Sequence, residues 1–465
     1  MRHSRARGSP VRVSSPAMHL PASSRSVLLS LLPGATLLLS PLAQAQQPGT
    51  PETPAASDAP AAPNEAPTNV EPASPSAPPA AVTPPPVAAK KETPWYEKIR
   101  LRGYTQFRYN RLPSFRVNED LINDQGDRFL GKNNGFGIRR ARLVISGDVH
   151  ERVSIYLQPD FASVISDQYN VAIMRDWYAD IFLDAAKEFR LRVGQSKVPY
   201  GFENLQSSQN RLAFDRNDAI NSALKDERDL GIFFYWAPSE IRQRFKDLVD
   251  NNLKGSGDYG VVGLGVYNGQ TANRPERNDN LHVVGRVTWP FLFGKQYVEV
   301  GAGGYYGRFN VTVSPSTGAP YVLADGKNDL VDARANVSLV VYPQPIGFMA
   351  EYNVGRGPST GGFGDFTIDS RPLRGGYAQL MYKLDNVAGV SIIPYVRGTL
   401  YEGGKKFETN APRYDVRELE MGVEWQILKA LEVTAAYLVS DRTSSRAPYQ
   451  QQRGDVTRIQ LQVNY

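Results

Sequence analysis

Apolar and polar residues alternate with period two through most of the chain beyond residue 95. The stretch IRLRGYTQFRYNR (99–111) places Leu101 and Phe107 on one parity and Arg102 and Arg108 on the other. This period is typical of a β-strand with two different faces, because successive side chains of a strand point to opposite sides. Helical periodicity is scarce, with one polar candidate at 240–253.

Sixteen segments share the alternation, and most are close to the roughly 9–11 residues that a transmembrane strand needs. Strands of soluble proteins average only about 5–6 residues. The pattern predicts strands at 99–111, 135–149, 152–162, 172–184, 188–197, 229–237, 258–268, 280–290, 296–309, 329–342, 346–355, 374–384, 390–401, 413–427, 430–442 and 455–465.

The connections between these segments also alternate, with short ones after most even strands and long ones after odd strands. An even strand count with short turns on one side and long loops on the other is the pattern of an outer-membrane β-barrel. The connection 238–257 disagrees, since it should be a short turn. It is interpreted as either a periplasmic insertion or an unrecognised hairpin.

The stretch TRIQLQVNY (457–465) ends the sequence with Leu461, Val463 and Tyr465 on one parity. We expect this parity to face lipid and the polar parity to face a lumen. Closure of the last strand onto the first would leave no unpaired edge, which lipid does not tolerate. The ending resembles the C-terminal aromatic signature of bacterial outer-membrane proteins, which implies delivery to the barrel-assembly machinery.

The first 94 residues differ in composition from the rest. Residues 1–45 combine arginines, an apolar run and the sequence Ala43-Gln44-Ala45, which predicts a signal peptide, with Met1 or Met18 as the start. Residues 46–94 are rich in Pro and Ala and predict a disordered linker. The barrel is expected at 95–465, and no apolar run after residue 45 is long enough for a transmembrane helix.

Charge and cysteine content add little about partners. Cysteine is absent, which excludes disulfides and thiolate chemistry. Removal of residues 1–45 takes away five arginines and leaves 48 basic against 47 acidic residues. Any electrostatic preference must therefore come from where the charges lie rather than from their total.

The inward parity of the expected strands carries many charges of both signs. Arginine is suited to anions because its planar guanidinium matches the oxygens of phosphate and carboxylate. Alternatively, these arginines pair with acids across strands and fill the wall. The inward bases are Arg100, Arg102, Arg108, Arg140, Arg142, Arg190, Arg192, Arg286, Arg334, Arg397 and Arg458, and the inward acids include Asp148, Asp160, Asp176, Asp180, Glu299, Asp332, Glu351, Glu418, Glu420, Glu424 and Glu432.

Two further features concern the shape of the pore. The 198–228 loop is the longest connection and contains Arg211 and Arg216, with Phe202 and Phe214 as candidate anchors. We expect it to fold inward and narrow the pore, the alternative being a solvated surface loop. Glu418, Glu420 and Glu424 are expected to face the arginines of the first two strands across the lumen and to temper anion preference.

The sequence contains no recognisable motif of an enzyme active site. The stretch GKNNGFG (131–137) lacks the spacing of a phosphate-binding loop, and only His150 and His282 lie beyond the leader, without metal-ligand neighbours. The sequence therefore predicts neither catalysis, nor a cofactor, nor a metal site, and nothing in it indicates nucleic-acid binding.

Four blocks carry a family resemblance: GFGIRRARLVISGDVHERVSIYLQPDFA (135–162), DWYADIFL (176–183), RLRVGQSKVPYGFENLQSS (190–208) and RDLGIFFYW (228–236). They resemble the phosphate-selective porin O and P family over about residues 95–465. The resemblance implies a sixteen-stranded trimeric outer-membrane porin whose third loop folds inward and whose lumenal Arg and Lys ladder conducts phosphate or other small anions. By motif position it also implies roles for Arg139, Arg140, Arg142 and Lys197.

Two functional hypotheses follow. The first is an all-β, sixteen-stranded porin in the Gram-negative outer membrane, with lipid, the barrel-assembly machinery, small anions such as phosphate and two further copies of itself as partners. The alternative is a secreted lectin-like β protein with a Pro-rich linker. For the porin, the predicted pore-lining and anion-binding residues are Arg100, Arg102, Arg108, Arg140, Arg142, Arg190, Arg192, Lys197, Arg211 and Arg216.

Overall fold

The computed structural model describes residues 94–112, 121, 123, 126, 135–165, 168–315, 320–362, 364–446 and 450–465. The expected signal peptide and all of the expected linker except Pro94 lie outside the described residues. So does most of the glycine-rich stretch 131–137.

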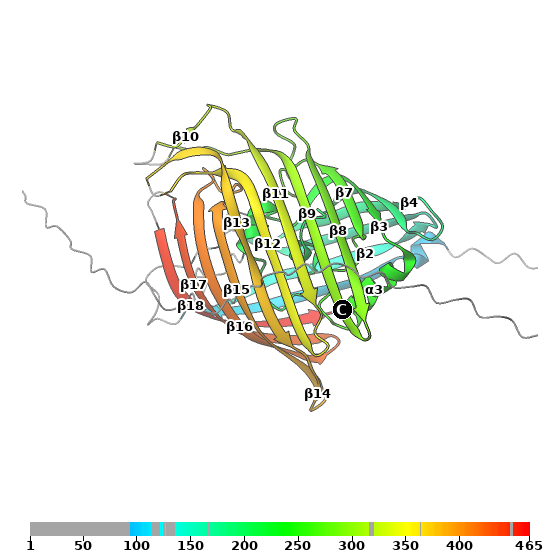
Figure 1. The fold of residues 1–465 in the computed structure, drawn as a ribbon. Helices are drawn as coiled ribbons and strands as arrows, with labels where there is room; N and C mark the ends of the chain where they lie inside the picture. Colours follow the sequence, from blue (N-terminus) through cyan, green and yellow to red (C-terminus); the bar gives the residue numbers. More distant parts are fainter. Residues whose placement is uncertain are drawn as a thin grey trace, which may run out of the picture. The chain divides into compact units, whose positions relative to one another are not determined.

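Sixteen antiparallel strands form a closed barrel (Figure 1). Each predicted segment corresponds to one of them, so the predicted fold class is confirmed. The strands are β1 (Arg100–Arg111), β2 (Gly135–His150), β3 (Val153–Ile165), β4 (Gln168–Phe182), β5 (Phe189–Lys197), β6 (Arg228–Trp236), β7 (Val262–Tyr267), β8 (His282–Phe293), β9 (Gln296–Asn310), β11 (Asp329–Val341), β12 (Ile346–Ser359), β13 (Thr367–Tyr382), β15 (Val390–Gly404), β16 (Arg413–Leu428), β17 (Leu431–Ser444) and β18 (Gln450–Asn464).

The barrel closes where β1 pairs with both β2 and β18. In the β1–β18 register, Phe107 lies opposite Leu461 and Tyr109 opposite Ile459, so apolar residues of the same parity meet across the seam. Closure satisfies the backbone hydrogen bonds of both strands, as a spanning sheet in lipid requires. The expected pairing of the last strand with the first is confirmed.

The remaining described elements are short. They are the strands β10 (Val322–Leu323) and β14 (Leu384–Val387), and the helices η1 (Trp95–Lys98), α1 (Phe202–Leu205), α2 (Asp218–Ala223) and α3 (Ser239–Asp250). None of the helices in the described part of the chain is both long and apolar enough to cross a membrane.

The two parities of the strands have opposite surroundings. Leu101, Phe136 and Trp177 are among the most exposed side chains and lie on the outer face. Tyr104 and Arg108, on the other parity of β1, are buried inside the barrel. The apolar outer face suits lipid, and the polar inner face suits a lumen, as the alternation predicts.

A β-bulge near the start of β2 breaks the simple parity rule. Gln106 pairs with Arg140, whereas Phe107 pairs with Ile138, so Arg139 is the extra residue of the bulge. A bulge re-aims side chains because two residues of one strand face one residue of its neighbour. As a result both Arg139 and Arg140 are buried inside the barrel, although strict alternation would place Arg139 outside.

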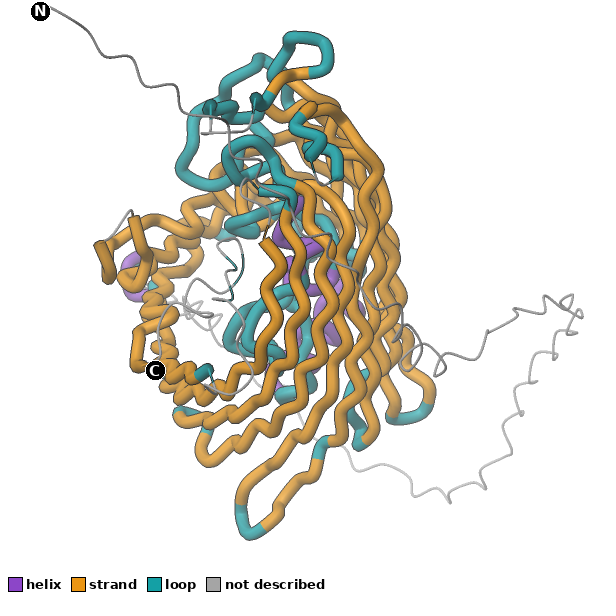
Figure 2. Tube along the Cα trace, turned by 90° about the vertical axis from the view of Figure 1, so that its left-hand side faces the viewer, coloured by secondary structure: helices purple, strands orange, loops and turns teal. Residues whose placement is uncertain are grey.

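The loop between β5 and β6 folds into the barrel, and Figure 2 shows loop and helix segments inside the ring of strands. Its residues Tyr200, Phe202 and Phe214 are almost fully buried. The predicted inward fold is therefore confirmed for the 198–228 loop, which contains α1 and α2. The solvated-loop alternative is wrong.

The connection between β6 and β7 is an insertion built around α3, so no hairpin was missed. The predicted polar helix at 240–253 is confirmed, with a buried stripe of Ile241, Phe245 and Leu248. This stripe packs in one apolar cluster with Phe202 of the inward loop and with residues of β11, β12, β13 and β15. The insertion therefore supports the inward loop at the end of the barrel that carries the short turns.

Candidate functional site

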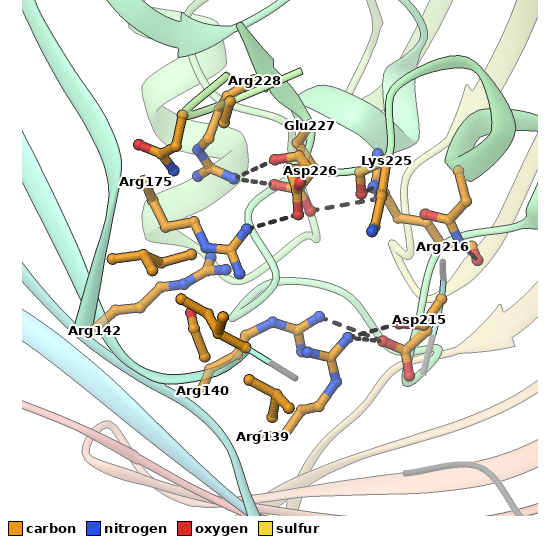
Figure 3. Close-up of a pocket in the computed structure, with 18 of the residues that line it drawn as sticks. Arg139, Arg140, Arg142, Arg175, Asp215, Arg216, Lys225, Asp226, Glu227 and Arg228 are labelled. Carbon is orange, nitrogen blue, oxygen red and sulfur yellow. Dashed lines mark hydrogen bonds and ion pairs between the residues drawn. The ribbon is translucent and has the colours of Figure 1, made fainter. Parts of the chain in front are cut away.

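A cavity of about 380 Å³ opens between the 198–228 loop and the wall formed by β2, β3 and β4, on the long-loop side of the barrel. We call it the vestibule (Figure 3). Its charged lining consists of nine cations and three acids: Arg139, Arg140, Arg142, Arg175, Arg211, Arg216, Lys225, Arg228 and Arg274, with Asp215, Asp226 and Glu227.

A second cavity of about 220 Å³ lies on the short-turn side, and we call it the inner chamber. Its wall comes from β1 to β6, from the inward loop and from the segment 256–259 that follows α3. Five cations and two acids line it: Arg102, Arg142, Arg192, Lys197 and Arg228, with Asp176 and Asp258.

Arg142 and Arg228 line both cavities and so mark the boundary between them. Arg142 donates to Asp160 at 2.9 Å and to the hydroxyl of Tyr104 at 2.8 Å. Arg228 pairs with Asp176 at 2.8 Å and also with Glu227 at 2.6 Å. Both guanidiniums are therefore held at fixed positions, which suits a neck between the vestibule and the inner chamber.

Asp215 of the inward loop gathers four arginines around one carboxylate. Its oxygens lie 2.8 Å from Arg108, 2.8 Å from Arg139, 3.4 Å from Arg140 and 2.9 Å from Arg458. Burial opposes ionisation of Asp215, but these arginines hold its pKa well below the usual value. Figure 3 shows Arg139 and Arg140 converging on this carboxylate.

Glu227 forms a second cluster of the same kind at the other end of the loop. Its carboxylate lies 2.6 Å from Arg228, 3.3 Å from Lys197 and 3.5 Å from both Arg211 and Arg216. Burial opposes ionisation, and the four cations nevertheless hold the pKa of Glu227 well below its usual value. Each cluster keeps an excess of positive charge beside the vestibule.

Phe214 anchors the loop through two cations. The guanidinium of Arg108 lies 4.8 Å from the centre of its ring and that of Arg458 lies 4.5 Å from it. Phe214 thus docks the loop against β1 and β18, while Phe202 docks it in the apolar cluster above α3. Both anchors predicted from the sequence are confirmed.

The opposite side of the loop is fastened to the far wall by buried ion pairs. Glu203 pairs with Arg397 of β15 at 2.6 Å. Asp218 pairs with Lys405 at 2.7 Å and with Arg442 of β17 at 2.9 Å. These groups are almost fully buried and hold the loop against the far wall. A cavity of about 30 Å³ remains on that side, much smaller than the two on the β2–β5 side.

Neutral and charged hydrogen bonds extend this attachment. Arg334 of β11 donates to the hydroxyl of Ser222 at 2.6 Å, and the hydroxyl of Tyr200 donates to Asn353 of β12 at 2.8 Å. Lys406 forms a buried pair with Asp332, and burial lowers the pKa of Lys406 to about 8. The loop 405–412 is thus a second inward connection that clamps the first.

The predicted transverse arrangement of acids and arginines is wrong. Glu418 pairs with Arg442 at 2.7 Å, Glu420 with Arg458 at 3.1 Å and Glu424 with Lys254 at 2.5 Å. These acids do not face β1 and β2 across an open lumen, because the inward loop and the α3 insertion supply or orient cations that neutralise them locally.

The ten predicted pore residues have different surroundings. Arg100 is exposed at the start of β1, and Arg102 is exposed and lines the inner chamber. Arg108 and Arg140 bind Asp215, and Arg142 stands at the neck.

On β5, Arg192 lines the inner chamber and pairs with Asp180 at 2.7 Å, whereas Arg190 pairs with Asp258 at 3.4 Å.

The last three predicted residues hold the loop itself. Lys197 donates to the carbonyl oxygens of Asn204, Leu205 and Gln206 at 2.9–3.1 Å, which caps α1. Arg211 donates to a loop carbonyl as well, and so does Arg216, whose pKa burial lowers to about 10. Their role in binding anions stays a prediction.

Several charged residues of the interior escaped the sequence reasoning. Arg139 is aimed inward by the bulge, Arg175 lies in the vestibule, and Lys254, Lys405 and Arg442 anchor loops. Only the family resemblance singled out Arg139. Lys254 and Lys405 lie in loops, where side chains do not alternate between two faces, so the period-two pattern could not identify them. Among the described residues, no group of three or more His, Asp and Glu side chains could hold a metal ion.

Comparison with known proteins adds a family match. A model described as phosphate-selective porin O and P matches residues 115–465. Similar solved structures include the outer membrane channel DcaP of Acinetobacter baumannii, at 11% identity and a TM-score of 0.47 over 79% of this chain and 97% of that one. OmpF of Salmonella typhi, in complex with daunomycin, has 12% identity and a TM-score of 0.49 over 79% and 97%.

An anion-selective porin from Comamonas acidovorans has 11% identity and a TM-score of 0.46 over 79% and 99%. A search of curated proteins finds no match.

Proposed function

The chain belongs to the phosphate-selective porin O and P family, and on that premise we propose that it conducts small anions, phosphate among them, along the β2–β5 wall of its lumen. Membership makes it a porin of the Gram-negative outer membrane and a diffusion channel rather than an enzyme. The family match and the closed barrel leave the lectin-like alternative without support.

The excess of cations along the two cavities, which share Arg142 and Arg228 in their linings, carries the proposal. Nine cations face three acids in the vestibule, and five face two in the inner chamber. Fixed charges act strongly where a passage is narrower than the Debye length, which is about 10 Å at 0.1 M salt. The loop creates such a passage, so an anion entering it meets positive potential throughout.

Asp215 and Glu227 moderate this preference. Each carboxylate occupies the place between four cations that a solute anion would otherwise take. Conduction requires an anion to leave as well as to enter, and a site that is already partly neutralised releases it faster. We therefore expect moderate anion preference rather than tight binding.

Arg102 gives the cleanest test of the pathway. It lines the inner chamber, and no hydrogen bond or ion pair joins it to another described residue, so its replacement disturbs no partner. Arg102→Gln should lower the permeability ratio of chloride to potassium, most clearly at low salt, in the reversal potential of planar bilayers. Arg417→Gln is the matched control, because Arg417 is 74% exposed outside the lumen. Equal chloride-to-potassium permeability ratios in the two variants would show that the conduction path does not pass Arg102 in the inner chamber.

The remaining partners and segments are part of the same proposal. We propose removal of residues 1–45 on export, a linker at 46–94, lipid around the apolar outer face and assembly into a homotrimer by the barrel-assembly machinery. Mass spectrometry of the mature protein and cross-linking in outer-membrane fractions would test cleavage and trimer formation.

A further inference from the structure

Tyrosines occupy one wall of the inner chamber, where a pore for inorganic anions has no need of them. Tyr156 of β3 and Tyr178 of β4 stack face to face, with ring centres 5.0 Å apart and planes 7° from parallel. The guanidinium of Arg192 lies 3.8 Å from the centre of the Tyr178 ring. The order around the wall is therefore Tyr156, Tyr178 and Arg192, an aromatic stack with a cation at one end.

Tyr259 completes the wall from the α3 insertion. Its ring lies 5.6 Å from the guanidinium of Arg192. The neighbouring Asp258 holds the segment in place, because it pairs with Arg242 of α3 at 2.9 Å and with Arg190 of β5 at 3.4 Å. The insertion thus does more than support the inward loop, since it also brings an aromatic ring to the chamber.

The stack leaves polar and aromatic groups available to a solute. In the part of the chain that the structure describes, the hydroxyls of Tyr156, Tyr178 and Tyr259 have no hydrogen-bond partner, although all three residues line the cavity. Within the same described residues, Tyr156 has a ring neighbour on one face only and is half-buried. Arg102, which lines the same cavity, offers an unpaired guanidinium.

We propose that the inner chamber is a binding station for organic anions that carry a flat aromatic ring, such as aromatic carboxylates. The carboxylate binds Arg102 and the Nη2 nitrogen of Arg142, whose Nη1 already donates to Tyr104, and the ring lies against Tyr156. This inference rests on the anion pathway proposed above and adds a class of solute to it.

The chemistry of the lining favours this class over inorganic anions. Phosphate or chloride uses only the guanidinium and hydroxyl donors and gains nothing from a stacked pair of rings. An aromatic ring gains both apolar contact and offset stacking, which is worth about 0.5–1.5 kcal/mol beyond burial for aromatic pairs, a factor of about two to ten in affinity. An aliphatic ring of the same size gains the contact but not the stacking.

Current block in planar bilayers tests the proposal. Benzoate and cyclohexanecarboxylate are the probes, because both are monocarboxylates with a six-carbon ring. Each is added on the short-turn side of full-length wild-type channels, and the concentration that halves the chloride current is measured. We expect benzoate to act at a concentration about two- to tenfold lower than cyclohexanecarboxylate.

Variants locate the effect. Tyr156→Leu should remove the difference between the two probes, whereas Tyr156→Phe should keep it, because the ring remains. Tyr352→Leu is the control, since Tyr352 is exposed on the outer face of β12. If Tyr156→Leu fails to show the heat-dependent gel shift of an assembled barrel, Tyr259→Leu replaces it, because Tyr259 lies outside the strands.

The outcomes separate this inference from the anion pathway. Equal block by the two probes in wild-type channels that prefer chloride to potassium would overturn the inference alone. A benzoate preference that survives both Tyr156→Leu and Tyr259→Leu would overturn it too, because the ring would then bind elsewhere. Wild-type channels without any chloride preference would overturn the proposed function instead.

Discussion

At the scale of single residues, the interior is built from carboxylates that each serve several cations. A buried ion pair is stable only when its desolvation is offset by close, multiple hydrogen bonds. Asp215 meets this condition with Arg108, Arg139, Arg140 and Arg458. The positions of Arg139 and Arg140 in the vestibule therefore depend on the carboxylate of Asp215.

Replacement of Asp215 by Asn should have two effects. Loss of the shared carboxylate removes one ion-pair partner from each of four buried guanidiniums, which costs about 3–5 kcal/mol for buried pairs and should lower the temperature of the heat-dependent gel shift. The channels that form should prefer chloride over potassium more strongly than wild type. Asp415→Asn is the control, because Asp415 is half exposed and, among the described residues, forms an ion pair only with Arg417. Wild-type values of both quantities in Asp215→Asn would show that the cluster does not depend on this carboxylate.

Residue positions could be predicted from the sequence only where strict alternation holds. Arg108, Arg142 and Arg192 follow the parity of their strands and lie inside as expected. Arg139 does not, because a bulge is set by local backbone geometry that leaves no mark on the apolar pattern. The partners of the inward arginines were also out of reach, since Asp215 and Glu227 reach them from a loop.

At the scale of elements, the 198–228 loop has two sides with different roles. One side bears the cation clusters and borders both cavities, and the other is fastened to the far wall through Glu203, Asp218 and Ser222. Its inward fold could be predicted from its length and its two phenylalanines. Its direction across the lumen could not, because this depends on Arg397, Lys405 and other groups distant in sequence.

Shortening of the loop between residues 203 and 224 should raise conductance severalfold and lower anion preference. The segment removed fills the lumen, so the passage widens and the fixed charges of the wall are screened before an ion meets them. Single-channel conductance and reversal potential in the same bilayers give both quantities. Unchanged conductance would mean that the loop is not the constriction.

One aromatic contact lies at the end of the seam between β1 and β18. Tyr465 exchanges backbone hydrogen bonds with Gly103, and its ring lies over that glycine so closely that a Cβ there would stand 2.5 Å from a ring carbon. An aromatic ring that covers a glycine on the neighbouring strand fixes the register of the pair. Gly103 and Tyr465 thus act as a unit in barrel closure.

Tyr465→Asp should reduce the amount of assembled, heat-modifiable protein in the outer membrane far more than it changes conduction. A charge near the membrane interface costs at most about 1 kcal/mol by itself. Tyr306→Asp provides the comparison, because Tyr306 is exposed on the same face but away from the seam. Equal amounts of assembled protein from the two variants would show that barrel closure does not require Tyr465 more than other exposed tyrosines.

At the scale of the whole molecule, the charge of the carboxylates that line the passage should be insensitive to pH. Burial opposes ionisation of Asp215, Asp226 and Glu227, but nearby cations hold their pKa values below the usual ones, and burial lowers the pKa of Arg216 only to about 10. Because the folded pKa values of these carboxylates are depressed, their contribution to stability is complete above about pH 5 and is lost only as the pH falls through those lower values.

The chloride-to-potassium permeability ratio should therefore stay constant between about pH 5 and pH 6. Reversal potentials measured in potassium chloride across this range test the expectation, with chloride used because phosphate itself changes charge there. A ratio that declines as the pH rises through this range would mean that a carboxylate of the passage is still protonated near pH 5, contrary to the low pKa values of Asp215, Asp226 and Glu227.

Strand number and barrel class were readable from the sequence because lipid enforces them. Every spanning strand must present an apolar parity, and this leaves a strong period-two signal. The two cavities were not readable, because their walls combine strands with the loop at 198–228 and the insertion at 237–261. Packing among such segments follows no period.

The neck formed by Arg142 and Arg228 separates two compartments of unequal size and unequal fixed charge: about 380 Å³ with nine cations against three acids, and about 220 Å³ with five against two. A passage whose two compartments differ in size and in net fixed charge behaves as an ionic diode. One polarity of the voltage then accumulates chloride around the neck and raises the local carrier density, whereas the opposite polarity depletes it. The barrel should thus rectify current without any moving part.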